Sequence, residues 1–177
     1  FFAELMSSSS QDLDDEFKTN VLSFAATLAN EDGDCFAFQC LRDIASKSEE
    51  IEFAQNISVE VYQLCMEKIN LPISSSKKFF LMRDNAVSTL ASFGLYVLKD
   101  SLDFEEFLQP FLNALPLVLD FSENQSVMEF FIWSFNRCQN ENFIELFLRV
   151  LIVLFSNLPS EISKMNLSQE MQSSLLN

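Results

Sequence analysis

The sequence predicts an all-α protein, and three features of its composition and patterning support this. The 177 residues include only 2 glycines and 4 prolines, so the residues that break helices are scarce. Apolar residues recur at the three- and four-residue spacing of amphipathic helices along most of the chain, without the sustained alternation that marks half-buried strands. With 49% apolar residues, 20 of them Phe, the chain can bury a substantial core in one compact domain or a short array.

The first part of the chain contains a polar segment and the first helices. Residues 1–11 include a serine tract and are expected to form a flexible N-terminal segment. A helix over residues 12–29 opens with three aspartates, which suit the positive end of the helix dipole, and it stops before Gly33. A second helix is expected over residues 35–45. The stretch 49–70 has helical periodicity and is either one helix with an internal break or two short ones.

The rest of the chain continues in the same pattern. Further helices are expected over residues 79–98, 102–115, 122–137, 142–157 and 168–176. Pro110 lies inside the second of these and either kinks that helix or marks an early restart. Pro159 ends the fourth, and Ser168 is a good N-cap for the last.

Consecutive helices form antiparallel pairs that recur about every 35–50 residues, a spacing typical of helical-repeat arrays. The pattern alone is equally consistent with a globular bundle, because both architectures bury one apolar stripe per helix. Either way, the apolar positions of the paired helices are expected to be buried, whereas the position of Trp133 is ambiguous. The residues chosen on this basis are Leu90, Phe93, Leu112, Leu115, Phe131 and Phe135.

The charge of the chain limits its partners. With 26 acidic and 11 basic residues, the formal net charge is -15. Such a chain is repelled by phosphate backbones, so we expect no nucleic-acid partner, whereas basic proteins suit it. The alternative is that the acidic excess only keeps a Phe-rich protein soluble. No membrane span is expected, because the longest apolar stretch, 143–155, is short and contains Glu145 and Arg149.

The residue types also argue against an enzyme. The absence of histidine excludes Ser-His-Asp and Cys-His nucleophiles and His-ligated metal sites. Two glycines cannot build a phosphate-binding loop, and carboxylate pairs such as Glu105 and Glu106 lie on amphipathic segments, where solvent exposure is usual. We therefore expect no catalytic residues, cofactor or metal. The cysteines show no paired spacing and are expected to be free thiols in a reducing compartment: Cys35, Cys40, Cys65 and Cys138.

One stretch resembles a known family. Arg83, Ala86, Leu90 and Phe93 have the spacing of the second helix of a HEAT repeat. The following apolar helix ends at Leu115-Pro116-Leu117 with Asp120 beyond it, and residues 166–177 are similar to a short terminal helix. This order resembles the C-terminal repeats of the importin-β (karyopherin-β) family of nuclear transport receptors, nearest the branch that imports ribosomal proteins and histones.

The resemblance implies a right-handed α-solenoid of about four HEAT-type helix pairs over residues 12–177, forming the C-terminal fragment of a longer receptor. It implies that Arg83 joins a ladder between stacked repeats. Acidic residues on the inner helices would contact basic cargo, and by their position in the repeat these are Asp43, Asp84 and Glu129.

The implied partners are basic cargo proteins, Phe-Gly nucleoporins, and Ran-GTP with its main site outside this fragment. The protein would shuttle between cytoplasm and nucleus. The alternative is an unrelated HEAT or armadillo scaffold, such as a phosphatase regulatory subunit or an adaptor, and a third class is an enzyme built on a helical bundle.

Overall fold

A computed structural model of the chain describes residues 15–32, 35–46, 58–72, 76–98, 104–138 and 140–156. Over these ranges the protein is all-helical: seven α-helices pack against one another, and no β-strand occurs. The α-helices are α2 (Asp15–Asp32), α3 (Cys35–Ser46), α4 (Ser58–Ile69), α5 (Lys77–Tyr96), α6 (Phe104–Ala114), α7 (Asn124–Arg137) and α8 (Ile144–Ser156). Two short 3₁₀ helices, η2 (Phe121–Glu123) and η3 (Glu141–Phe143), lead directly into α7 and α8.

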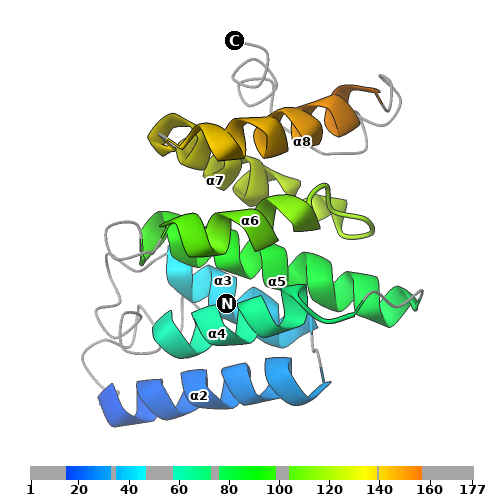
Figure 1. Cartoon of the computed structure of the whole chain (residues 1–177). Coiled ribbons are helices and arrows are strands. Elements are labelled where there is room, and N and C mark those ends of the chain that lie inside the picture. Colours follow the sequence, from blue (N-terminus) through cyan, green and yellow to red (C-terminus); the bar gives the residue numbers. More distant parts are fainter. Residues whose placement is uncertain are drawn as a thin grey trace.

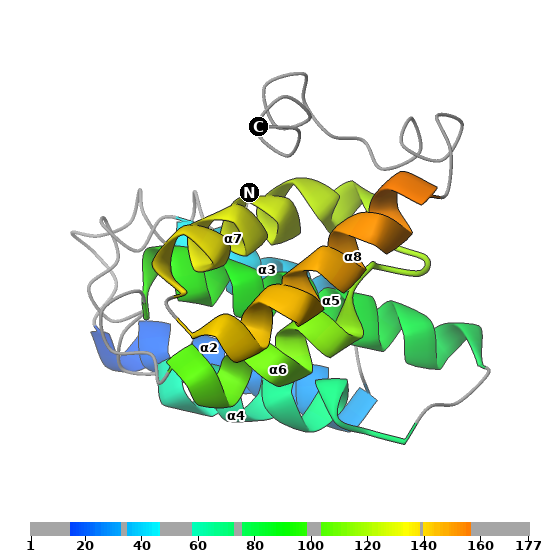
Figure 2. The same cartoon turned by 45° about the horizontal axis from the view of Figure 1, so that its top comes forward.

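The helices form two layers, and the chain alternates between them. One layer contains α2, α4, α6 and α8, each packed on the next, and the other contains α3, α5 and α7 in the same order. Figure 1 shows the first layer rising from α2 to α8, with the second layer behind it, and Figure 2 shows the same two layers from a tilted view. The arrangement follows from amphipathic helices joined by short connections, because each helix buries one stripe against its own layer and one against the other.

Helix α5 lies at the centre of the molecule. It contacts α3, α4, α6 and α7, and every residue from Asp84 to Gly94 is buried. The helix begins at the N-cap Ser76, whose side chain accepts a hydrogen bond from the backbone N–H of Phe79 at 3.1 Å. Its buried hydroxyl groups are satisfied locally: the hydroxyls of Ser88 and Thr89 both donate to the Asn85 carbonyl oxygen. Polar residues can therefore occupy the buried stretch of this helix.

Aromatic rings fill the space between α6, α7 and α8. The Phe130 ring lies 5.1 Å from that of Phe111 and 5.3 Å from that of Phe107, measured between centroids. On the other side of α7, the Phe131 ring meets that of Phe147 edge-on at 5.1 Å. These separations and tilts are those that aromatic pairs prefer, so the numerous Phe residues form a packed core.

Five of the six positions predicted to be buried are buried: Leu90, Phe93, Leu112, Leu115 and Phe131. The prediction for Phe135 was wrong, because 48% of this residue is exposed. The buried stripe of α7 runs through Val127, Phe130, Phe131 and Ser134. Phe135 lies beside this stripe, and its ring packs against that of Phe147 at 5.3 Å.

Where the two can be compared, most of the predicted helix ends differ from the structure by one to three residues; α5, for example, spans Lys77–Tyr96 where 79–98 was predicted. Pro110 lies inside α6, which continues through it to Ala114. The ambiguous Trp133 is half-buried and stacks on the Phe130 ring at 5.4 Å. The predicted flexible segment 1–11, the first part of 49–70 and the predicted helix 168–176 lie outside the described residues.

Candidate functional site

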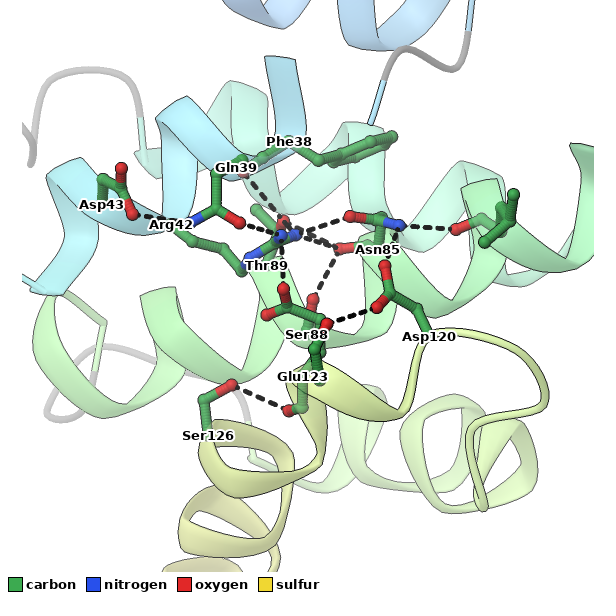
Figure 3. A network of polar contacts seen from close by, with 12 residues as sticks. Phe38, Gln39, Arg42, Asp43, Asn85, Ser88, Thr89, Asp120, Glu123 and Ser126 are labelled. Atoms are coloured by element: carbon green, nitrogen blue, oxygen red, sulfur yellow. Dashed lines mark hydrogen bonds and ion pairs between the residues drawn. The ribbon is translucent and has the colours of Figure 1, made fainter. Parts of the chain in front are cut away.

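The layer of α3, α5 and α7 contains a continuous polar network that begins at Arg42. Arg42 lies on the apolar face of α3 between the buried Phe38 and Ala45, and only 5% of it is exposed. Its Nη2 donates to Oε1 of Gln39 at 2.8 Å and to Oε1 of Glu123 at 2.9 Å, while its Nη1 donates to Oδ1 of Asn85 at 3.0 Å. Figure 3 shows the guanidinium at the centre of these contacts. One side chain therefore links α3 to α5 and to the start of α7.

Asn85 extends the network towards the loop after α6. Its Nδ2 donates to Oδ2 of Asp120 at 3.0 Å and to the Leu81 carbonyl oxygen at 2.9 Å. The other oxygen of Asp120 accepts a hydrogen bond from the Ser122 hydroxyl at 2.6 Å. Oδ1 of Asn85 also accepts a hydrogen bond from Arg42. The Asn85 amide therefore links α3, through its oxygen, to the loop after α6, through its nitrogen (Figure 3).

Asp84 holds the same loop from the other side. Its Oδ2 accepts hydrogen bonds from the backbone N–H groups of Val118, Leu119 and Asp120, at 2.9, 2.6 and 3.0 Å. Asp84 is only 1% exposed, and burial raises the pKa of its carboxyl above the ordinary value, although the three N–H bonds oppose that shift. The carboxyl is a structural anchor for the loop between α6 and η2.

Arg42 is surrounded by more negative than positive charge. Burial lowers the pKa of its guanidinium, and the nearby carboxylates of Glu123, Asp120 and Asp43 oppose this shift. Burial also raises the pKa of Glu123, against the attraction of Arg42. An arginine stays protonated at neutral pH even so. One buried cation thus faces three carboxylates, and this end of the layer is acidic overall.

The structure places the three predicted cargo-binding acids on the three helices of one layer: Asp43 on α3, Asp84 on α5 and Glu129 on α7. Asp43 is half-buried and accepts from Nε2 of Gln39 at 2.7 Å, and Glu129 is half-buried and accepts from Nε2 of Gln125 at 2.9 Å. Asp84 requires a correction, because its buried carboxyl faces the loop and offers no surface to a partner.

Arg83 lies next to this network, and its charge opposes the rise in the pKa of Asp84. It is half-buried, and its Nη2 donates to the Asn113 carbonyl oxygen in the last turn of α6, at 3.3 Å. The Asn113 side chain in turn accepts from Nη2 of Arg149 on α8 at 2.7 Å. Arg83 therefore contacts a helix end, where carbonyl groups lack partners within the helix. Its role in a ladder between repeats stays a prediction.

Sequence reasoning missed Arg42, Asn85 and Glu123, which form the network. The burial of Arg42 could have been predicted, because it falls among apolar residues at helical spacing. A charge at such a position needs a buried partner. Glu123 could not be found in the same way, since it lies 81 positions away at a turn and its pairing depends on the tertiary arrangement.

An open groove of about 970 Å³ lies on the other layer, along α8 and beside Gln109 of α6. Its apolar wall comes from Leu148 and Ile152, and its polar edge includes Glu145 and Arg149. It is larger than the hollow of about 430 Å³ beside α2 and α4.

The remaining chemistry is sparse. Within the described ranges, no three His, Cys, Asp or Glu side chains come together in a way that could hold a metal ion. All four cysteines are free thiols, as predicted, and burial raises the pKa of Cys65 so far that its thiol stays protonated. None of the helices described is both long and apolar enough to cross a membrane.

No family model, curated protein or solved structure matches this chain.

Proposed function

We propose that this chain is the C-terminal part of an importin-β-like nuclear transport receptor, a right-handed α-solenoid of HEAT-type pairs that carries basic protein cargo through the nuclear pore under Ran control. In this proposal the protein is a binding surface and not an enzyme. It shuttles between cytoplasm and nucleus, and the main Ran-GTP site lies outside this fragment.

The observation that carries the proposal is the polar network that joins one helix of a layer to the next. Arg42 of α3 reaches Asn85 of α5, and both reach the turn that begins α7. A ladder of this kind is what stacked repeats use to hold their register, because each buried polar group needs a partner from the neighbouring repeat. The alternation of the chain between two layers is the second support.

The layer of α3, α5 and α7 is the proposed cargo face. Asp43 and Glu129 are half-buried carboxylates on its first and last helices, and the acids around Arg42 add further negative charge. Negative charge on a binding surface speeds the encounter with a basic partner more than it raises the affinity. We therefore expect weak, salt-sensitive binding of basic cargo by this fragment alone.

The groove between α6 and α8 is the proposed nucleoporin site. Leu148 and Ile152 provide apolar area that is 50% and 65% exposed, in a hollow that an aromatic side chain can enter. The lining of apolar residues with a few polar ones at the edge is typical of sites for small apolar groups.

Binding to immobilised Phe-Gly repeat peptides tests the proposal, with Ser-Gly repeats of the same length as the control peptide. The receptor hypothesis expects selective retention on Phe-Gly and loss of retention in Leu148→Asp. The matched control Val118→Asp changes an apolar residue that is 39% exposed in the loop after α6, and it should be retained normally. Equal retention on both peptides would favour an unrelated HEAT or armadillo scaffold.

A further inference from the structure

Helix α8 is apolar on two sides, one packed and one exposed. On the packed side it lies against α6, and its Phe147 ring meets that of Phe131 on α7. On the other side lie Ile144, Leu148 and Ile152, here called the α8 stripe, which are 46%, 50% and 65% exposed. Neighbouring apolar side chains that stay exposed on one helix are a common mark of an interaction surface.

The α8 stripe lies at one end of its layer. Helix α2 packs on α4, α4 on α6, and α6 on α8. Among the described helices none continues the layer beyond α8, as Figure 1 and Figure 2 show. The stripe therefore faces away from the rest of the described fold, where a partner can approach it.

Two opposite charges lie beside the stripe. Glu145 and Arg149 are one helical turn apart, both are exposed, and both line the groove along α8. Nη2 of Arg149 donates to Oδ1 of Asn113 at 2.7 Å, which holds the guanidinium in place and leaves its other N–H groups for a second acceptor. Within the described ranges, neither Glu145 nor Arg149 is in an ion pair. With one acid and one base, α8 is neutral in a chain whose net charge is -15.

The order of these residues along α8 makes the surface complementary to itself. When two α8 helices lie antiparallel with Leu148 facing its own copy, Ile144 faces Ile152 of the second copy, since each is four positions from the centre. The two-fold axis keeps the charged flanks of both helices on the same side. Glu145 is three positions from the centre, and Arg149 of the second copy is one position from it in the same direction. The two charges are thus about 3 Å apart along the helix axes, and the pair occurs twice.

We propose that the α8 stripe is the interface of a homodimer, in which two antiparallel α8 helices meet at Leu148 and Glu145 of each copy binds Arg149 of the other. One helix against its copy makes a small interface, and the net charge of each chain opposes association, so the dimer is weak and reversible. The dimer does not depend on the proposed function. Because it covers Leu148 and Ile152, the dimer and a bound Phe-Gly peptide exclude each other.

The mass of the full chain in solution tests the interface without any peptide. Sedimentation equilibrium at about 150 mM salt limits the charge repulsion, and a reductant keeps the free cysteines from cross-linking copies. We expect the mass to rise with concentration from the 20.3 kDa of one chain towards twice that value. Ile152→Asp should weaken dimerisation at least about tenfold, because it buries an unpaired charge. The matched control Val59→Asp changes a residue of α4 that is 60% exposed and should leave the dimer unchanged. A single-chain mass at every concentration, or equal losses in the two variants, would overturn the proposal.

Charge exchange tests the antiparallel arrangement. Arg149→Glu and Glu145→Arg each place like charges at both contacts, so each variant alone should dimerise at least about tenfold more weakly. Mixed together, the two variants should form a heterodimer, because the two bases of one then face the two acids of the other. Titration of one labelled variant with the other by fluorescence anisotropy measures this recovery, and circular dichroism verifies that both are folded. Lys77→Glu and Glu60→Arg make the same charge changes at exposed positions of α5 and α4 and should not affect the dimer. Folded variants that fail to pair when mixed, or controls that dissociate the dimer equally, would contradict the proposed contact.

Discussion

The guanidinium of Arg42 lies 2.9 Å from Oε1 of Glu123, although 81 positions separate the two residues in the chain. Both side chains are largely withdrawn from solvent, with 6% and 16% exposed. The pair connects the second described helix to the turn that begins α7, across the side of α5 that carries Asn85 and Thr89 (Figure 3). Because the pair joins parts of the chain that are 81 positions apart, it reports whether the layer of α3, α5 and α7 has assembled.

Removing this cation should destabilise the fold strongly. Arg42→Ala leaves Glu123 and Asp120 without their counter-charge in a partly dry environment, and we expect a loss of about 3–5 kcal/mol in the free energy of unfolding. Arg42→Lys keeps the charge but not the planar fork, so it should lose about 1–2 kcal/mol. Urea denaturation measures both. A double-mutant cycle with Glu123→Gln should give a coupling above about 1 kcal/mol, and additive losses would show that the two residues act independently.

Asp84 should behave as a buried acceptor. Asp84→Ala removes the oxygen that accepts three backbone N–H groups, and we expect a loss of about 3 kcal/mol or more in stability. Asp84→Asn retains a carbonyl oxygen and should lose less. Equal losses in the two variants would mean that the loop does not depend on these hydrogen bonds.

The pH dependence of stability provides a second test of the same residue. Because the pKa of Asp84 is raised on folding, the native state holds its proton more tightly than the unfolded chain does. Its contribution is therefore greatest below the ordinary aspartate pKa and is lost as the pH rises through the raised value. The stability of the parent chain relative to Asp84→Asn should thus fall as the pH rises from the ordinary aspartate pKa of about 4 towards neutrality. A relative stability that rises over this interval would reverse the assigned direction.

Gly94 is a position where a larger residue should be harmful. A Cβ placed there would lie 2.5 Å from a ring carbon of Phe130, which is itself fully buried. Gly→Ala in a helix normally stabilises by up to about 1 kcal/mol, but overpacking of this kind costs about 1–3 kcal/mol. We expect Gly94→Ala to lower the melting temperature. In a Phe130→Leu background the same substitution should become neutral or favourable, because the obstructing ring is gone.

Some features of the fold and of the polar network could be predicted from the sequence, and others could not. The helices could be predicted because apolar spacing and stop signals such as the break around Gly33 are local features. The burial of Leu90 and Phe93 followed from the same spacing. The role of Asp84 could not be predicted, since an acid beside a predicted helix face looks the same whether it faces solvent or a loop contributed by a distant segment. Arg42 and Glu123 find each other only once the layers pack.

Phe131 and Phe135 form a matched pair for the packing of α7. Phe131 is 2% exposed and Phe135 is 48% exposed, and both contact the ring of Phe147. Phe131→Ala should cost about 3–5 kcal/mol, as for a fully packed ring. Phe135→Ala should cost less than half of that, because part of the ring already lies in water. Chemical denaturation of the two variants under one set of conditions shows which substitution costs more stability. A larger loss at Phe135 would mean that the face of α7 assigned to the core is the wrong one.

The charged face of α3, α5 and α7 is proposed to bind basic cargo. Because Asp84 is buried, the test uses Asp43 and Glu129, which lie on α3 and α7 of the same layer. Fluorescence anisotropy with a labelled basic peptide should show Asp43→Asn/Glu129→Gln binding about fivefold more weakly, as expected for the loss of two partly exposed charge pairs. Glu60→Gln/Glu67→Gln removes the same charge from exposed positions on α4 in the other layer, and it should change the affinity by less than about twofold.

Raising the salt from about 50 to 500 mM shortens the screening length about threefold and should weaken binding to the parent chain markedly. If the two double variants lose affinity equally, the attraction comes from the net charge of -15 and not from one face. Binding that ignores both salt and substitution would leave these helices with a purely structural role in the receptor.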